Sequence, residues 1–359
     1  MTTGVQLSPS AAPMELASLC EDPLVSVVIT SYNYAEFITE ALKSVLEQDY
    51  AQIEVIVADD GSTDNTSEIV KDFASRDTRV RWKAGVNLGQ PRNTNRGFAE
   101  TSGEIICFLD ADDTFRPRKL QAVVKALRES PECGLCLHNV QKVDQRGRPF
   151  GPPYPGHIKS GWVLQELLSS GGRCLFPPTS GIAVRREVAE RIFPIRTEFR
   201  KVGDAYIHFP AAFLSRVCVA PGAYSTYRQH NRNMSWHFNS TLERLVGQLQ
   251  EFEEVFATNR EFVATHLGYE YAESLKITDS HEVVERALSY LLVSGRSEYK
   301  GLTMAQLRND LPSGILKNLW VCLSTLPPPI ARYLFLGRQS AVTLTNAVRQ
   351  ALPWQPSRD

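Results

Sequence analysis

Three polar clusters in the first third of the chain each follow an apolar run, and their side chains could bind a charged ligand. They occupy residues 31–34 (SYNY), 59–64 (DDGSTD) and 110–113 (DADD). Carboxylates repel a phosphate group unless a cation lies between them, and oxygen ligands at a loop suit Mg²⁺ or Mn²⁺. The spacing of Asp110 and Asp112 therefore predicts a divalent-cation site that binds the phosphates of a ligand.

The elements that position these clusters can be predicted from hydrophobic periodicity. Continuous apolar runs predict buried strands at residues 24–30, 53–58, 80–82, 104–109, 133–140, 181–184 and 217–227. Helical spacing predicts helices at 35–47, 66–73, 91–101, 187–193 and directly after Gly203. Strands alternating with helices indicate a doubly wound, mostly parallel α/β sheet, which binds ligands at the carboxyl ends of its strands. We therefore expect the three clusters to converge on one crevice.

Composition divides the chain into a tail, an α/β domain and a helical C-terminal region. Residues 1–22 are rich in Ala, Ser and Pro and predict a disordered tail, whereas residues 23–238 form the predicted α/β domain. Within that domain, residues 149–178 are rich in Pro and Gly and predict loops over a site. Residues 239–359 predict a helical region, with amphipathic helices at 242–256 and 282–292.

Composition excludes several classes of protein. The 39 basic and 40 acidic side chains nearly balance, which argues against a nucleic-acid partner. No secretory leader is visible, and no window approaches the roughly 20 apolar residues that span a bilayer, so we expect a cytoplasmic protein without a transmembrane helix. The first strand is not followed by G-x-G-x-x-G, and no Walker lysine follows a Gly-rich loop, which disfavours the two common nucleotide-binding modes.

The seven cysteines are scattered and fit a reducing compartment. Cys133 and Cys136 have C-x-x-C spacing, but they fall in a predicted strand. Residues three apart on a strand face opposite sides, which suits neither zinc nor a redox pair. We therefore interpret both as buried small side chains.

The motifs together resemble those of the inverting family 2 glycosyltransferases with a GT-A fold. The resemblance covers residues 24–120 through VSVVITSYN, VIVADDGSTDNT, the spacing Asn87-x-Gly89-x-x-Arg92-Asn93, and GEIICFLDADD. Three later segments match less tightly: PPTSG at 177–181, Gly203-Asp204 and Tyr227-Arg228-x-His230. Gly203 departs from the pattern, because many members of the family carry an acidic residue before the catalytic base.

The resemblance implies a role for each matching residue. Thr30, Tyr32 and Asp60 would surround the nucleotide base, with Tyr32 stacking on it and Asp60 accepting a hydrogen bond. Asp59 would share that role, and Arg92 would approach the base or the phosphates. Asp112 would be the principal ligand of Mg²⁺ or Mn²⁺, Asp110 would face the ribose or the metal, and His230 would approach the metal or the diphosphate. Asp204 would be the general base.

The resemblance also implies an activity. It is the metal-dependent, inverting transfer of a sugar from a nucleotide-diphosphate sugar to an acceptor hydroxyl. A UDP-sugar is the default donor, and a glycan or lipid-linked molecule is the expected acceptor, in the assembly of a surface or secreted glycan. Two other classes stay open: a sugar-nucleotide-binding module without turnover, and a haloacid-dehalogenase-like phosphatase, since residues 110–114 also fit D-x-D-x-T.

Several of these residues also have a purely structural interpretation. Tyr32 could pack on the following helix, Asp64 and Asp204 could each cap a helix, and Asp113 could be either a ligand or a cap. Residues 311–358 carry five basic and no acidic side chains among aromatic ones. That composition suits peripheral contact with the inner face of a membrane, or packing on the domain or on a partner subunit in an oligomer.

Overall fold

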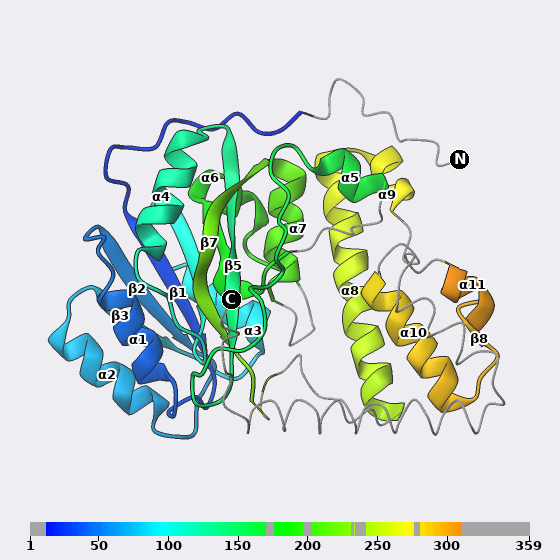
Figure 1. The fold of residues 1–359 in the computed structure, drawn as a ribbon, viewed down its shortest axis with the longest axis horizontal. Helices are drawn as coiled ribbons and strands as arrows, with labels where there is room; N and C mark the ends of the chain where they lie inside the picture. Colours follow the sequence, from blue (N-terminus) through cyan, green and yellow to red (C-terminus); the bar gives the residue numbers. More distant parts are fainter. Residues whose placement is uncertain are drawn as a thin grey trace, which may run out of the picture.

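The computed structural model describes residues 12–169, 176–196, 203–230, 233, 242–275 and 281–309. Its central sheet has seven strands in the order β3-β2-β1-β4-β6-β5-β7 (Figure 1). Their bounds are β1 Val25–Ser31, β2 Ile53–Asp59, β3 Val80–Ala84, β4 Ile105–Asp110, β5 Cys133–Val143, β6 Ile182–Arg185 and β7 Arg216–Arg228. All paired strands are parallel except β6, which is antiparallel to both β4 and β5. The prediction of a mostly parallel α/β sheet is confirmed.

Helices cover both faces of this sheet, so alternate residues of a central strand enter two different cores. In β1, Val27 and Ile29 pack with one face and Val28 packs with the other. The first face carries α1 (Ile38–Leu46), α2 (Thr66–Arg76) and α4 (Lys119–Glu129). The second face carries α3 (Gln90–Phe98), α6 (Arg186–Ile192) and α7 (Ala205–Leu214). Burial on both faces is why the strands are continuous apolar runs rather than alternating ones.

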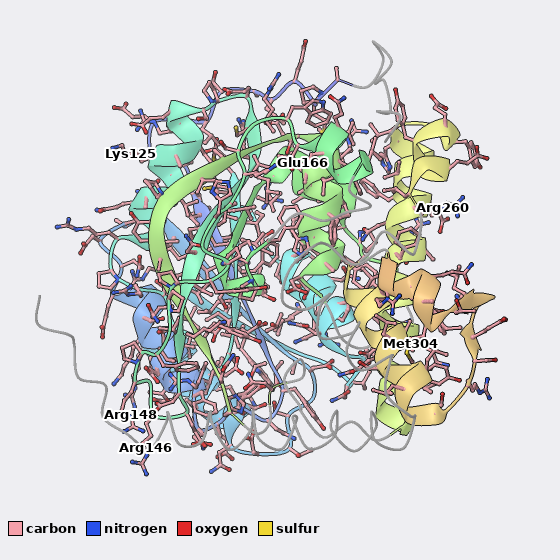
Figure 2. The ribbon with its side chains drawn as sticks, turned by 45° about the vertical axis from the view of Figure 1, so that its right-hand side comes forward. Lys125, Arg146, Arg148, Glu166, Arg260 and Met304 are labelled. Atoms are coloured by element: carbon pink, nitrogen blue, oxygen red, sulfur yellow. The ribbon has the colours of Figure 1, made fainter. Side chains whose placement is uncertain are left out.

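The remaining described elements are mostly helical. They are α5 Leu164–Ser169, the short 3₁₀ helix η1 Thr179–Gly181, α8 Leu242–His266, α9 Tyr269–Ser274, α10 His281–Ser294, the hairpin β8 Glu298–Tyr299 with β9 Leu302–Thr303, and α11 Met304–Asn309. Helix α8 packs beside α7, and Val255 and Val263 of α8 enter the core of the second sheet face. Figure 2 shows Arg260 of α8 and Met304 of α11 on the side away from Lys125 of α4. No described helix is long and apolar enough to cross a membrane.

The described part of the predicted tail is bound to the domain. Residues 12–20 have no helix or strand, yet the amide of Met14 donates to the carbonyl of Leu214 at 2.8 Å. The amide of Cys20 donates to the carboxylate of Glu104 at 3.1 Å. The prediction of a disordered tail over residues 1–22 is therefore wrong for this segment. Residues 1–11, like the basic segment 311–358, lie outside the described residues.

The expected orientation of Cys133 and Cys136 is also wrong. The pairing of β5 with β7 shifts register between Cys133 and Leu135, which leaves Gly134 unpaired in a bulge. Both cysteines consequently lie on the same face of the sheet, in the same core as Cys218. Periodicity alone could not show this, because one inserted residue reverses the faces of a strand.

Candidate active site

The three polar clusters meet at one edge of the sheet. Thr30 near the end of β1 pairs with Ala58 of β2 on one side and with Asp110 of β4 on the other. The amide of Asp60 donates to the carbonyl of Ser31 at 2.9 Å, and the amide of Ala111 donates to the carbonyl of Thr30 at 3.1 Å. Because these strands run in the same direction, the chain segments that follow them leave the sheet side by side, as the sequence predicted.

The loops after β1 and β2 hold each other in place. Asn33, with a positive φ of 56°, accepts a 2.7 Å hydrogen bond from the amide of Thr63 through its side-chain oxygen. The carboxylate of Asp64 accepts from the amides of Thr66 and Ala35 at 3.0 and 3.1 Å. Asp64 thus accepts from the first residue of α2, but the N-cap residue of that helix is Asn65, so the interpretation of Asp64 as the cap is wrong by one residue. Gly61 turns the loop with a φ of 78°, where a Cβ would lie 2.8 Å from the carbonyl oxygen of Gly85.

The adjacent residues Asp59 and Asp60 have different surroundings. Asp59 is fully buried, and its carboxylate accepts from the amide of Ser62 and the hydroxyl of Ser67, so it stabilises the loop itself. Asp60 accepts from the amides of Leu88 and Gly89 at 2.9 and 2.7 Å. Asp60 thus joins the loop after β2 to the loop after β3, and it is the member of the pair that remains a candidate for contact with a nucleotide base.

Exposed apolar side chains surround Asp60. Tyr32 is 44% exposed, Val86 is 71% exposed and Leu88 is 36% exposed. The structure therefore does not place Tyr32 in a packed core against the next helix, which was its structural interpretation. An apolar, flat side chain open to solvent at a ligand-binding edge suits stacking on a planar ring.

The arginine beside Asp60 is Arg96, to which the sequence gave no role, whereas Arg92 was expected at the base or the phosphates of a nucleotide. A nitrogen of Arg96 lies 3.6 Å from the Asp60 carboxylate and also donates to Asn93, one turn earlier in α3, at 2.6 Å. Arg92 is half-buried on the same helix. The i, i+3 spacing of Asn93 and Arg96 was the sequence signal for this pair, and only the orientation of α3 showed which arginine reaches Asp60.

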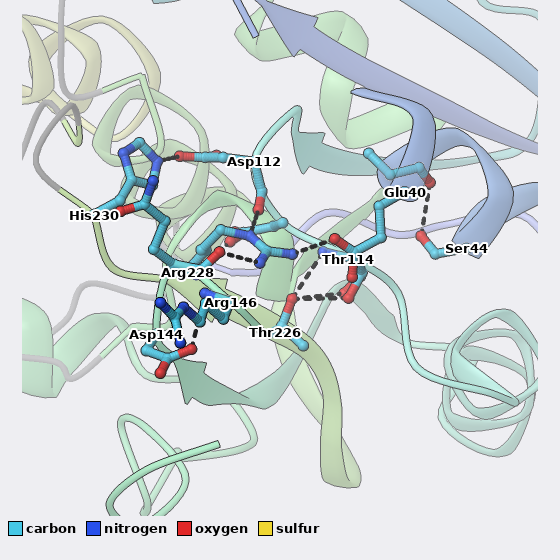
Figure 3. Close-up of polar contacts among 12 residues, drawn as sticks. Glu40, Ser44, Asp112, Thr114, Asp144, Arg146, Thr226, Arg228 and His230 are labelled. Atoms are coloured by element: carbon cyan, nitrogen blue, oxygen red, sulfur yellow. Dashed lines mark hydrogen bonds and ion pairs between the residues drawn. The ribbon is translucent and has the colours of Figure 1, made fainter. Parts of the chain in front are cut away.

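Asp112 and His230 meet at the other side of this edge (Figure 3). The Nε2 atom of His230 lies 2.9 Å from an oxygen of Asp112, and both side chains are almost completely buried. The side-chain amide of Asn233 reaches the same carboxylate oxygen at 3.3 Å. Burial and then the charge of Asp112 raise the pKa of the Tyr34 phenol. The His230 ring stacks on Phe37 with centroids 5.1 Å apart. Sequence reasoning found Asp112 and His230 but missed Tyr34 and Asn233.

Arg228 fixes the backbone around this pair. It is buried, and its Nε donates to the carbonyl of Asp112 at 2.7 Å, while another nitrogen donates to Glu40 of α1 at 2.6 Å (Figure 3). Asp113 accepts from the amide of Arg228 at 2.7 Å and from the hydroxyl of Ser180 at 2.6 Å. Asp113 thus ties β7 and η1 to the loop after β4, rather than capping the next helix.

Asp110 lies between the Asp112 pair and the start of α7. One of its oxygens accepts from the Thr30 hydroxyl at 3.0 Å and from the Gln90 side-chain amide at 2.9 Å. Burial, and then the charges of Asp112 and Asp204, raise the pKa of Asp110 to about 7. Repulsion between these carboxylates shows that they share one low-dielectric region.

Asp204 is the N-cap residue of α7. It is half-buried, and one of its oxygens accepts from the amide of Ala205 at 2.9 Å. The structural interpretation of Asp204 as a helix cap is therefore confirmed, and its charge also acts on Asp110. The phenol of Tyr227, on β7, has its pKa raised by burial and then by the charges of Asp113, Asp112, Asp204 and Asp110. Tyr227 therefore belongs to the same cluster, although sequence reasoning gave it no role.

The residues fit a divalent cation only in part. In the segments that the structure describes, no group of three or more His, Cys, Asp or Glu side chains is arranged to hold a metal ion. The expected set of Asp110, Asp112 and His230 is therefore not preassembled. Asp112 and His230 alone supply one oxygen and one nitrogen, and Mg²⁺ and Mn²⁺ commonly complete their coordination with waters and substrate phosphates.

Comparison with known proteins covers the part of the site that is built from β1 to β4. Residues 26–193 match the model of Glycosyl transferase family 2. An uncharacterized glycosyltransferase of Nostoc sp. is 36% identical over 217 residues, which are 58% of this chain and 66% of that protein. The O-antigen biosynthesis protein RfbC of Myxococcus xanthus is 34% identical over 193 residues, 53% of this chain and 14% of that protein. The chain thus spans less than two thirds of these relatives.

Solved structures show the same fold at low sequence identity. S. aureus TarS 1–349 in complex with UDP-GlcNAc is 18% identical, with a TM-score of 0.53 and coverage of 92% of this chain and 93% of that chain. The mannosyltransferase PcManGT from Pyrobaculum calidifontis, in complex with GDP-Man and Mn²⁺, is 19% identical, with a TM-score of 0.51 and coverage of 94% and 90%.

Proposed function

We propose that this chain, whose residues 26–193 match the model of Glycosyl transferase family 2, is a glycosyltransferase. It would move a sugar from a nucleotide-diphosphate sugar to an acceptor hydroxyl, with inversion at the anomeric carbon. One observation carries the proposal: Tyr32, Asp60, Asp110, Asp112, Asp204 and His230 lie along one edge of the sheet. Tyr32 would be the base-stacking surface, Asp112 and His230 the phosphate-side pair, and Asp204 the general base.

The nucleotide would bind at the Tyr32 side. Tyr32 would stack on the base, Asp60 would accept a hydrogen bond from it, and Thr30 would support the position of Asp110 near the ribose. TarS binds UDP-GlcNAc and PcManGT binds GDP-Man. Both support a nucleotide sugar as the donor, and their nucleotide bases differ. A UDP-sugar is our default donor.

The phosphates would bind at Asp112 and His230. Mg²⁺ or Mn²⁺ bound there would neutralise the charge that develops on the departing diphosphate, an effect typically worth several kcal/mol. The side-chain amide of Asn233 donates to the Asp112 carboxylate and Arg228 donates to its backbone carbonyl, so the carboxylate is positioned before the donor binds.

Asp204 would act as the general base. Its carboxylate accepts the proton of the acceptor hydroxyl while the oxygen of that hydroxyl bonds to the anomeric carbon. The bond from this carbon to the phosphate oxygen breaks in the same displacement, and the nucleoside diphosphate leaves. Such proton removal typically contributes 10²–10⁴-fold to the rate. A glycan or lipid-linked acceptor agrees with the O-antigen biosynthesis relative.

The position of residues 110–114 in the fold argues against a haloacid-dehalogenase-like phosphatase. The D-x-D-x-T pattern at residues 110–114 follows β4, after three earlier strands. Haloacid-dehalogenase-like phosphatases carry this pattern after their first strand. The carboxylate of Asp110 is also held by Thr30 and Gln90, which does not suit a nucleophile.

The test is a thermal-shift panel of UDP, GDP and other nucleoside diphosphates, each with Mn²⁺. A ligand that binds only the folded protein raises its melting temperature, by an amount set by the ratio of ligand concentration to Kd. We expect one diphosphate to raise the melting temperature with Mn²⁺ and to lose that effect in Asp112→Asn. No shift with any nucleotide, in a folded sample, would refute the proposal. Donor hydrolysis or transfer that disappears in Asp112→Ala would exclude a non-catalytic binding module.

A further inference from the structure

Gln90, at the first position of α3, connects the donor side of the site to the segment that carries the general base. Its side-chain nitrogen donates to a carboxylate oxygen of Asp110 at 2.9 Å. Its side-chain oxygen accepts from the amide of Gly203 at 3.2 Å. The two contacts join residues 20 and 113 positions away in the sequence, and Gly203 directly precedes Asp204.

The contact also accounts for the glycine at position 203. A Cβ on Gly203 would lie 3.2 Å from the Cγ and the Cδ of Gln90, which is closer than ordinary van der Waals contact. An acidic side chain at this position would also add a charge beside Asp110 and Asp204, which already repel each other. A neutral amide opposite a glycine avoids both problems.

The chemistry of this bridge requires an amide. The Asp110 carboxylate only accepts hydrogen bonds and the Gly203 amide only donates one, so the bridging group must do both. Glutamine does so with a single planar group. A carboxylate could still accept from Gly203 but would repel Asp110, and an alanine would make neither contact.

We propose that Gln90 is a positioning residue that holds the Gly203–Asp204 turn in register with Asp110, so that the base faces the sugar of the bound donor. This inference rests on the proposed function, because it takes Asp204 as the base and Asp110 as a donor-side residue. Gln90 acts through the turn, so its loss should slow transfer more than it weakens donor binding. A misplacement of about 1 Å at a reacting group can lower a rate about 100-fold.

The test compares Gln90→Ala and Gln90→Glu with the parent chain. We expect kcat for transfer to fall about 10- to 100-fold in both variants, while the Kd of the nucleoside diphosphate with Mn²⁺ changes by less than about twofold. Gln121→Ala is the matched control, because Gln121 is exposed on α4 and its amide donates only to the carbonyl of Asp49 at 3.1 Å. It should keep the parent kcat. Gln90→Glu keeps the side-chain volume, so it remains informative if the alanine variant folds poorly.

A double-substitution cycle tests whether Gln90 acts through position 203. Gly203→Ala alone should lower kcat, because its methyl group displaces Gln90. In the Gln90→Ala background the same substitution should have little further effect, since the side chain it would displace is gone. Multiplicative losses in the double variant, or a Kd that rises while kcat stays constant, would overturn the proposal. If the parent chain neither binds nor uses a nucleotide sugar, the proposed function itself is wrong, and that result is separate from either outcome.

Discussion

At the scale of single residues, the acidic side chains of the site share a chemistry but have different partners. Asp59 and Asp64 accept from backbone amides of their own loop, and Asp113 accepts from Arg228 and Ser180. Asp112 instead contacts His230. The sequence placed Asp64 at the start of the next helix, because this spacing is local information, although the N-cap residue itself is Asn65. The sequence could not separate Asp59 from Asp60, because adjacent carboxylates on one loop differ only in what the rest of the fold brings to them.

Tyr32 provides a prediction at this scale. Replacing it with alanine should weaken nucleoside diphosphate binding about tenfold, since stacking of a base on an aromatic ring is worth about 1–3 kcal/mol. Tyr32→Phe keeps the ring and should bind within about twofold of the parent chain. Calorimetric titration with Mn²⁺ present measures both. Equal weakening in the two variants would show that the hydroxyl, not the ring, is what the ligand contacts.

The buried ammonium of Lys119 predicts a pH dependence. Lys119 is fully buried, donates to the carbonyl of Ser180 at 2.9 Å and lies 3.3 Å from the centre of the Phe115 ring. Burial lowers its pKa from 10.5 to about 7. Between about pH 7 and pH 10.5 the unfolded chain therefore binds more protons at this residue than the folded chain, so its contribution to stability improves as the pH rises.

The measurement compares Lys119→Met with the parent chain by thermal or urea unfolding. The methionine variant has no ammonium to bury, so its stability relative to the parent should be highest at pH 6 and should decline steadily towards pH 9.5. A difference that stays constant over this range would mean that Lys119 keeps an ordinary pKa in the folded protein. Exposed Lys125 on the same helix offers a control, Lys125→Met, with no such trend.

At the scale of elements, α3 carries Gln90, Arg92 and Arg96 and packs closely on the sheet. Gly97 makes this approach possible, because a Cβ there would lie 2.4 Å from Val28 of β1 and 3.3 Å from Ala58 of β2. The predicted helix at 91–101 was close to the observed one, Gln90–Phe98. Helix propensity by itself disfavours a glycine inside a helix. Gly97 is explained by the close packing of α3 on the sheet, which cannot be seen from the sequence of the helix alone.

The same substitution at two helical glycines should therefore have opposite effects. Gly97→Ala should destabilise the protein by about 1–3 kcal/mol, since the added methyl group overlaps β1. Gly247→Ala, in α8, meets no atom within 4 Å and should stabilise it by about 0.5–1 kcal/mol. Urea unfolding of both variants checks the pair. A neutral or stabilising Gly97→Ala would mean that α3 lies farther from β1 than the structure shows.

At the scale of the whole molecule, the helical region and the α/β domain share a core. Val263 of α8 is fully buried in the core that also contains residues of α7, the helix that Asp204 begins. The described tail residues add contacts to Glu104 and to Leu214, the last residue of α7. The described part of the region beyond residue 239 therefore supports the site through α7, rather than forming a separate unit.

This shared core predicts that a substitution in α8 lowers the stability of the α/β domain as well. Val263→Ala should lower the stability by about 1–3 kcal/mol, through lost apolar contacts and the cavity it leaves. The unfolding transition should stay single, because the two regions unfold together. Glu261→Ala, two residues away and exposed, is the control and should change stability by less than about 0.5 kcal/mol. Two separate transitions in calorimetry would contradict a shared core.

The sequence by itself determined the strands, most helices and the edge at which the polar clusters meet, because these follow from local periodicity and from the common direction of parallel strands. It also named Asp112 and His230, whose motifs are local. Only the tertiary structure decided which carboxylates are held by the protein itself, that Arg96 rather than Arg92 reaches Asp60, and that Gln90 connects Asp110 to Gly203. These depend on contacts between residues far apart in the chain, and such contacts are set by how helices pack on the sheet, which no single segment encodes.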